Sequence, residues 1–181
     1  MSLDTANINL IYDRTESDET ASAAIRKSYQ TLGNWSGLTD AERAQLERGM
    51  LTYNTLNRVE SAVKTLAAEL NAAGYPVEVT PVLKGSKAED REWQEGDIVR
   101  RAQWTTYLDN VQRLRDAYYT LAETGELPAP EDKLGYVGAN TIEKVLADID
   151  LLIDCMKSSY RRCGTFRAGN NAAHLPLKGS V

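Results

Sequence analysis

Two segments of this chain place apolar residues at every third or fourth position, and this periodicity constrains the fold more than any other feature. The first segment runs from about Thr52 to Ala73, and the second from about Ala139 to Arg162. Such spacing gathers the apolar side chains in one stripe along a helix, and the stripe has to be buried against another element. The stripes consist of Leu56, Val59, Val63, Leu66 and Leu70, and of Ile142, Leu146, Ile149, Ile153 and Met156. We therefore expect two long helices that face each other.

Three further helices are predicted from the same periodicity and from capping residues. A helix over 18–32 is expected to bury one stripe, formed by Ala21, Ala24, Ile25, Tyr29 and Leu32. Thr39 and Glu42 have the spacing of a capping box, which predicts a short helix that ends at about Arg48. Helical periodicity returns over 97–124 and stops before a glycine.

The segment between the predicted helices over 52–73 and 97–124 is not helical. Val77, Val79 and Val82 lie at near-alternate positions, but the neighbouring prolines exclude a central strand. We expect an extended or edge segment that joins residues 8–12. The predicted fold class is therefore mainly α: an antiparallel helical bundle with two pseudo-repeated helices, a small β or extended element, and extended termini.

Length and composition favour a single domain. The chain has 181 residues, of which 42% are hydrophobic, and this is enough to bury one core. The expected divisions are an N-terminal arm over 1–13, a helical bundle domain over 14–164 and an extended C-terminal tail over 165–181.

The two long helical segments share more than their apolar stripes. When they are aligned at an offset of 83 residues, three polar or aromatic positions also match: Tyr53 with Tyr136, Asn57 with Asn140, and Glu60 with Glu143. Shared ancestry and convergent packing both explain such an echo. All six residues fall in the first turns of their helices, where the Asn and Glu side chains can bond amides of loops or helix ends.

The charge balance disfavours two classes of partner. A net charge of −5 repels phosphate backbones and anionic membranes, so direct binding to nucleic acid is not expected. Residues 1–10 contain neither a basic start nor a long apolar run, so no secretory signal or membrane insertion is predicted. We expect synthesis in a cytoplasm.

Motifs for catalysis or for a cofactor are not found in this sequence. It has a single histidine, His174, and lacks a phosphate-binding loop or a nucleophile elbow. We therefore expect neither an enzyme nor a bound cofactor. One alternative stays open, a metal-dependent enzyme built on Glu60, Glu143 and Asp150, because an acidic helical protein can hold a metal between carboxylates.

The order of several short motifs resembles a known group of proteins. Residues 53–60 read YNTLNRVE and residues 70–75 read LNAAGY, and they are followed by Trp93 with Asp97 and Ile98. The next matches are Tyr107, Leu108, Asn110, Val111, Leu114 and Arg115. They are followed by Leu127 and Pro128, and then by Ala139, Asn140, Ile142, Glu143 and Lys144. In this order they resemble a recurrent element of phage and prophage virion proteins from Gram-positive, mainly clostridial, bacteria. The chain departs from that pattern after Ile98, where proline is absent, and at 163–166, where CGTF replaces an acidic ending.

The resemblance implies a non-enzymatic structural module of a tail, baseplate or receptor-binding assembly. The chain would then reside in the virion after synthesis in the bacterial host, with other virion proteins and further copies of itself as partners. Two alternatives remain: a tail component that binds a host-surface carbohydrate, with the loop over 86–96 around Trp93 as platform, and a head or decoration protein. Candidate interface residues are Ile8, Leu10, Tyr12, Trp35, Trp93, Phe166, Leu175 and Leu177. For Trp35 and Trp93, packing in the core is the favoured alternative.

Overall fold

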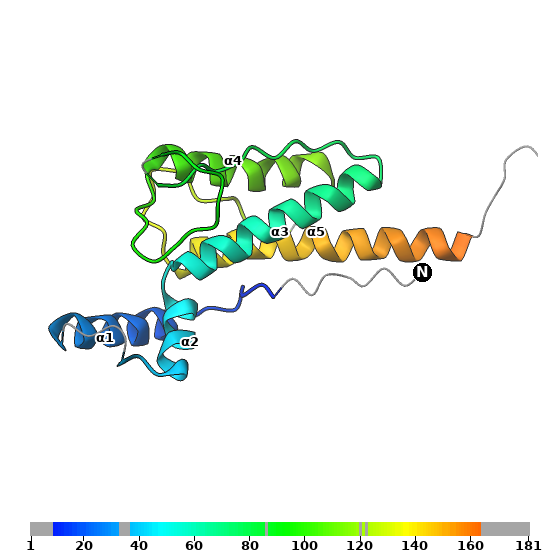
Figure 1. Ribbon diagram of the computed structural model, residues 1–181. Helices are drawn as coiled ribbons and strands as arrows, with labels where there is room; N and C mark the ends of the chain where they lie inside the picture. Colours follow the sequence, from blue (N-terminus) through cyan, green and yellow to red (C-terminus); the bar gives the residue numbers. More distant parts are fainter. Residues whose placement is uncertain (1–8, 33–36, 86, 120, 122, 164–181) are drawn as a thin grey trace, which may run out of the picture.

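The computed structural model describes residues 9–32, 37–85, 87–119, 121 and 123–163, and within these ranges the chain forms five helices (Figure 1). They are α1 (Glu16–Leu32), α2 (Asp40–Gly49), α3 (Tyr53–Ala72), α4 (Arg101–Ala117) and α5 (Tyr136–Cys163). The mainly α prediction is confirmed. The described residues contain no strand, only one isolated bridge between Lys84 and Glu89. The predicted pairing of 8–12 with 77–82 is therefore wrong for its described part, residues 9–12.

Several predicted residues lie outside the described ranges. They are Ile8, Trp35, Phe166, Leu175 and Leu177. The same holds for the C-terminal tail over 165–181 and for residues 1–8 of the N-terminal arm.

Local sequence signals explain where the helices begin and end. Thr39 Oγ1 accepts a hydrogen bond from Glu42 N, and the Glu42 carboxylate accepts one from Thr39 N, so the predicted capping box starts α2. Thr52 Oγ1 accepts from Thr55 N and starts α3. After α3, Gly74 adopts a φ of 92°, which permits Tyr75 N to donate to Leu70 O and closes the helix.

The three long helices α3, α4 and α5 run in the same direction, so the predicted antiparallel arrangement is wrong (Figure 1). Near their beginnings, Arg58 of α3 contacts Glu143 of α5 at 3.0 Å. Near their ends, Lys157 of α5 contacts Glu69 of α3 at 3.1 Å. Tyr75, three residues after the end of α3, and Tyr118, directly after α4, meet edge to face with ring centroids 4.7 Å apart.

The connections between these helices are long enough to permit the parallel arrangement. Helix α3 has 20 residues and spans ~30 Å, which an extended chain of about nine residues can retrace. Residues 73–100 and 118–135 both exceed that length. Each connection therefore returns along the bundle before the next helix begins, as Figure 1 shows for the segment after α3.

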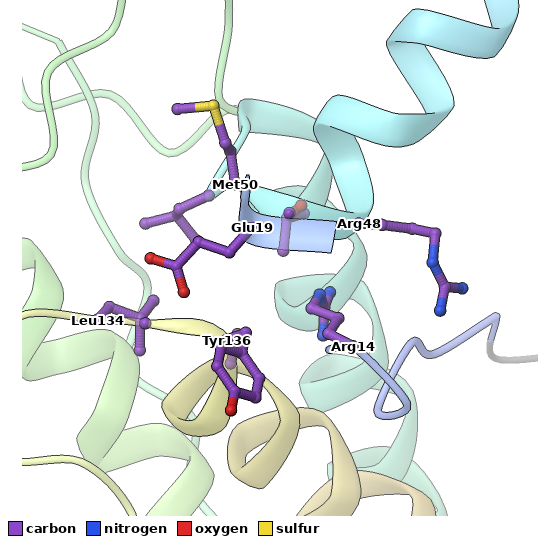
Figure 2. A pocket seen from close by; sticks show the side chains of 11 residues that line it. Arg14, Glu19, Arg48, Met50, Leu134 and Tyr136 are labelled. Carbon is purple, nitrogen blue, oxygen red and sulfur yellow. The ribbon is translucent and has the colours of Figure 1, made fainter. Parts of the chain in front are cut away.

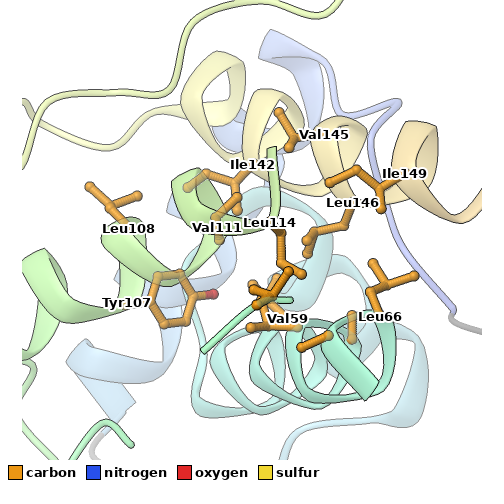
Figure 3. Close-up of a cluster of buried hydrophobic side chains, with 14 of the residues drawn as sticks. Val59, Leu66, Tyr107, Leu108, Val111, Leu114, Ile142, Val145, Leu146 and Ile149 are labelled. Atoms are coloured by element: carbon orange, nitrogen blue, oxygen red, sulfur yellow. The ribbon is translucent and has the colours of Figure 1, made fainter. Parts of the chain in front are cut away.

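The core lies between α3, α4 and α5, and the two helices of the sequence echo face each other as predicted. Figure 3 shows labelled side chains of all three helices pointing toward this core. The extended segment after α3 adds Val77 and Val82 to the same cluster. The buried apolar residues of the helices are Leu56, Val59, Ala62, Val63, Leu66, Ala67, Leu70, Trp104, Tyr107, Leu108, Val111, Leu114, Ile142, Val145, Leu146, Ile149 and Ile153.

Helix α4 is shorter at both ends than the predicted span of 97–124. At its beginning, Asp97 accepts hydrogen bonds from Gln94 N and from Arg91, which folds this residue into a turn instead of a helix. Ile98, an apolar residue within the predicted helical span, is 80% exposed. At the other end, Tyr118 is extended and packs against Tyr75. Side-chain bonding within the loop therefore overrides the helical periodicity at this point.

Helices α1 and α2 form a hairpin that projects from the bundle (Figure 1). Among helix pairs with substantial contact, these two pair only with each other. The predicted stripe on α1 is buried only in part, because Ile25 and Tyr29 are half-buried whereas Ala21 and Ala24 are exposed; the side chain of Leu32 lies outside the described part. Among the described side chains of this helix, Ser22 is the buried one. Ser22 Oγ donates a hydrogen bond of 2.7 Å to Gln45 O in α2. A short α2 covers only a narrow part of α1, so Ala21 and Ala24 stay at the surface.

We predict that Gly49→Ala loosens this hairpin. A methyl group on Gly49 would lie 2.1 Å from both Asp18 O and Ser22 Oγ, so α1 has to move away from α2. Overpacking of this kind costs about 1–3 kcal/mol. Hydrogen exchange of the α1 amides should accelerate. Gly125→Ala is the matched control, because its added methyl group would lie at 3.5 Å from Thr141 Cγ2, and equal exchange in the two variants would contradict the prediction.

Candidate functional site

The parallel arrangement brings the Asn and Glu residues of the sequence echo to the same end of the bundle. Asn57 and Glu60 are the fifth and eighth residues of α3, and Asn140 and Glu143 are the fifth and eighth residues of α5. Each Asn–Glu pair binds a different extended segment of the chain. We call these four residues, together with the cations that contact their carboxylates, the polar layer; the cations are Arg14, Arg58 and Lys84.

On α5, Asn140 binds the backbone of the N-terminal arm. Its Oδ1 accepts a hydrogen bond of 3.1 Å from Arg14 N, and its Nδ2 donates one of 2.8 Å to Arg14 O. The side-chain amide thus pairs with both polar groups of one residue, as a neighbouring strand would. This satisfies the backbone of an arm that has no sheet partner.

Glu143 completes the attachment of the arm. Its carboxylate accepts from Ile11 N at 2.6 Å and from the Arg14 guanidinium at 2.5 Å. Arg58 of α3 donates to the same carboxylate at 3.0 and 3.2 Å. The Glu143 side chain is only 1% exposed and that of Arg14 2%. Since a buried carboxylate is stable only when it is paired and hydrogen-bonded, both arginines are needed at this position.

On α3, Asn57 and Glu60 bind the loop before α4 in a similar way. Asn57 Oδ1 accepts from Trp93 N at 2.7 Å, and Asn57 Nδ2 donates to Trp93 O at 2.9 Å. The Glu60 carboxylate accepts from the indole Nε1 of Trp93 and from Lys84 Nζ, each at 2.6 Å. Lys84, which is 1% exposed, also lies 5.6 Å from the centre of the indole. The loop is thus pinned by one asparagine and one ion pair.

Two other asparagines, not predicted from the sequence, repeat the backbone pairing without a glutamate. Asn110 of α4 accepts from Thr80 N at 2.9 Å and donates to Thr80 O at 2.8 Å. Asn71 of α3 pairs with both groups of Val77 at 2.9 Å. The sequence signal for this pairing is Asn110 itself, because it is an amide side chain within an apolar helical stripe.

The tyrosines of the echo do not join the polar layer. Tyr53 is 40% exposed at the beginning of α3, and Tyr136 is half-buried at the beginning of α5. Tyr107 of α4 instead lies close to both glutamates. Burial, followed by the charges of Glu143 and Glu60, raises the pKa of the Tyr107 hydroxyl well above its ordinary value, so this group stays protonated.

The structure confirms the core interpretation of Trp93 and corrects its two alternative roles, as an interface residue and as a carbohydrate platform. Trp93 is 2% exposed and packs in the core, so it cannot be an anchor for a partner or a platform for a sugar. The sequence placed it in a polar loop, but the Asn57 and Glu60 bonds draw its indole inward. Of the arm residues, Leu10 packs partly against the core, whereas Tyr12 is 48% exposed and lies near Lys144.

The three carboxylates of the metal hypothesis do not converge. Glu60 and Glu143 bind separate cations in the polar layer, and Asp150 lies farther along α5. Burial, followed by the charges of Asp154 and Glu69, raises the pKa of Asp150. Within the described ranges, no group of three His, Cys, Asp or Glu side chains could hold a metal ion. The metal hypothesis built on these residues is therefore wrong.

A small cavity of about 40 Å³ separates the hairpin from the bundle beside the polar layer. Figure 2 shows Arg14, Glu19, Arg48 and Met50 on one side of it and Leu134 and Tyr136 on the other. This volume has room for a few water molecules only. The hairpin is therefore not closely packed on the bundle at this junction.

We predict that Asn140→Ala releases the arm locally. Both hydrogen bonds to the Arg14 backbone are lost, and an unsatisfied buried pair of this kind costs about 1–3 kcal/mol. Hydrogen exchange at the Arg14 amide should accelerate roughly tenfold or more. The matched control is Asn54→Ala, because Asn54 is exposed and its side-chain amide donates to the Glu47 carboxylate, away from the arm. Equal exchange at Arg14 in both variants would refute the role of Asn140.

We predict a second, pH-dependent effect at the loop that carries Trp93. The Arg91 guanidinium, and then Gln94 N–H, lower the pKa of Asp97 from 3.8 to about 2. Because the folded pKa is depressed, this stabilisation is complete above pH 4 and is lost as the pH falls through 2. The stability difference between the unmodified chain and Asp97→Asn, measured by urea denaturation, should therefore shrink over this range. A difference that is constant from pH 5 to pH 2 would contradict the assignment.

Comparisons with protein-family models, with curated proteins and with solved structures found no match to this chain. None of the helices in the described part of the chain combines the length and the apolar character needed to cross a membrane. What the polar layer can do therefore has to follow from its own chemistry.

Proposed function

We propose that this chain is a non-enzymatic structural protein of a phage particle, a tail or baseplate component that docks neighbouring subunits through its bundle and its extended termini. The observation that carries the proposal is the attachment of the N-terminal arm. An extended segment is held by backbone pairing with Asn140 and by ion pairing with Glu143. Backbone pairing combined with an ion pair is a way in which a folded subunit binds an extended peptide segment. Subunits that assemble use contacts of this kind between copies.

The chemistry of the polar layer supports an architectural role. Glu143 is neutralised by Arg14 and Arg58, and Glu60 by Lys84. Among the described residues, every buried side-chain nitrogen or oxygen has a hydrogen-bond partner within the chain. A general acid or base needs a proton it can give or take at a free position, whereas these groups are committed to holding segments in place.

The virion setting comes from the sequence resemblance described above. The motifs over 53–60 and 139–144 that carry it contain Asn57, Glu60, Asn140 and Glu143, the residues that bind the two extended segments. The motifs that carry the resemblance thus include the residues that attach the two extended segments to the helices. A head or decoration protein remains the alternative within the same class, because this mode of attachment would serve either location.

The decisive experiment is mass spectrometry of purified particles, with tails and heads separated before digestion. We expect peptides of this chain in the tail fraction, in several copies per particle, since docking between copies requires more than one. Particles from a host that lacks the gene provide the control for contamination. Recovery only in heads would favour the decoration alternative, and absence from both fractions would overturn the proposal.

A further inference from the structure

We propose that the N-terminal arm and the α1–α2 hairpin exchange between copies of this chain, so that Arg14 of one copy binds Asn140 and Glu143 of a neighbour. This inference rests on the proposed assembly function and names the partner as a second copy. The arm and the hairpin together, in the described ranges 9–32 and 37–49, are called the exchange unit below. Its attachment, its connection to α3 and the chemistry of its binding site each support the proposal.

The exchange unit is held together by contacts of its own. Arg48 of α2 contacts Asp13 of the arm at 3.1 Å and Asp18 of α1 at 3.4 Å. Thr15 N donates to the Asp18 carboxylate at 2.8 Å, so the arm is joined to the beginning of α1. Close packing at Gly49 fixes α2 against α1. The arm and the two helices can therefore move as one body.

The α1–α2 hairpin of the exchange unit has few attachments to the bundle. Neither α1 nor α2 shares a substantial helix contact with α3, α4 or α5, and a cavity lies at the junction (Figure 2). The principal polar attachment is the arm, through Ile11 and Arg14. Its direct covalent link to α3 is short: Met50 is extended, with φ −139° and ψ 155°, and Leu51 is 42% exposed. Rotation of this link would redirect the unit while the core of the bundle stays intact.

The binding site for the arm favours continuous occupancy. Without Arg14, the buried Glu143 would keep only Arg58, and both polar groups of the Asn140 amide would lose their partners. Such an empty site is strongly unfavourable, so the arm of the same chain or that of a neighbour has to fill it. The arm of the same chain and the arm of a neighbour would make the same contacts with Asn140 and Glu143. Where copies are held side by side, the high effective concentration of neighbouring arms favours exchange.

Complementary charge reversal distinguishes exchange from binding within one chain. Arg14→Glu and Glu143→Arg each place like charges in the binding site when the arm stays in its own chain. When the two full-length variants are refolded together, exchange pairs opposite charges in both sites of a mixed dimer. We expect native mass spectrometry to detect the mixed dimer and neither homodimer. The double variant Arg14→Glu/Glu143→Arg is the control, since it restores pairing within one chain or between identical chains.

A second measurement keeps the proposal testable if those variants fail to fold. Arg14→Lys conserves the charge and introduces an amine that carbodiimide can couple to Glu143. Normal and heavy-isotope chains of this variant are unfolded, mixed in equal amounts and refolded at increasing concentration. Exchange predicts cross-linked arm–α5 peptides that carry both isotope patterns, with a share that rises with concentration. Cross-links of uniform isotope at every concentration would overturn the proposal.

Exchange between copies and presence in the virion are tested by separate measurements. Cross-links within one chain, combined with the presence of the chain in purified tails, would refute exchange and leave the assembly role intact. Mixed-isotope cross-links, combined with absence from particles, would support exchange and refute the virion assignment.

Discussion

The pairing of asparagine side chains with the backbone of extended segments is the interaction on which this structure depends. A helix uses its own amides and carbonyls internally, so it cannot satisfy the backbone of a segment that runs along it. Asn57, Asn71, Asn110 and Asn140 solve this problem, because each binds both the N–H and the C=O of one residue. Parallel helices require such returning segments, and the asparagines fix where those segments lie.

The buried charges add selectivity to this backbone pairing. An asparagine amide fits any residue of an extended chain, whereas Glu143 requires a cation beside the segment it binds. Arg14 provides that cation for the arm, and Lys84 provides it for Glu60 in the loop before α4. Together, these features set which residue of each segment lies in the site.

The two halves of the polar layer share their chemistry but differ in topology. The segment bound by Asn57 and Glu60 is internal and is tied to a helix on each side, so it cannot leave its own chain without unfolding the bundle. The segment bound by Asn140 and Glu143 belongs to the arm that precedes α1 and is connected to the bundle through a short link after α2. The same contacts thus stabilise the fold in one half and provide an exchangeable joint in the other.

The sequence by itself determined the helices that have apolar stripes and local caps, because periodicity and capping are properties of neighbouring residues. It also singled out Asn57, Glu60, Asn140 and Glu143 as groups able to bond loop amides. Tertiary structure alone decided that α3, α4 and α5 run parallel, since the long connections permit either direction. It also decided that Trp93 turns inward and that Arg14 is the partner of Glu143, residues 129 positions apart. Contacts over such separations depend on how the whole chain packs, so the local sequence pattern does not indicate them.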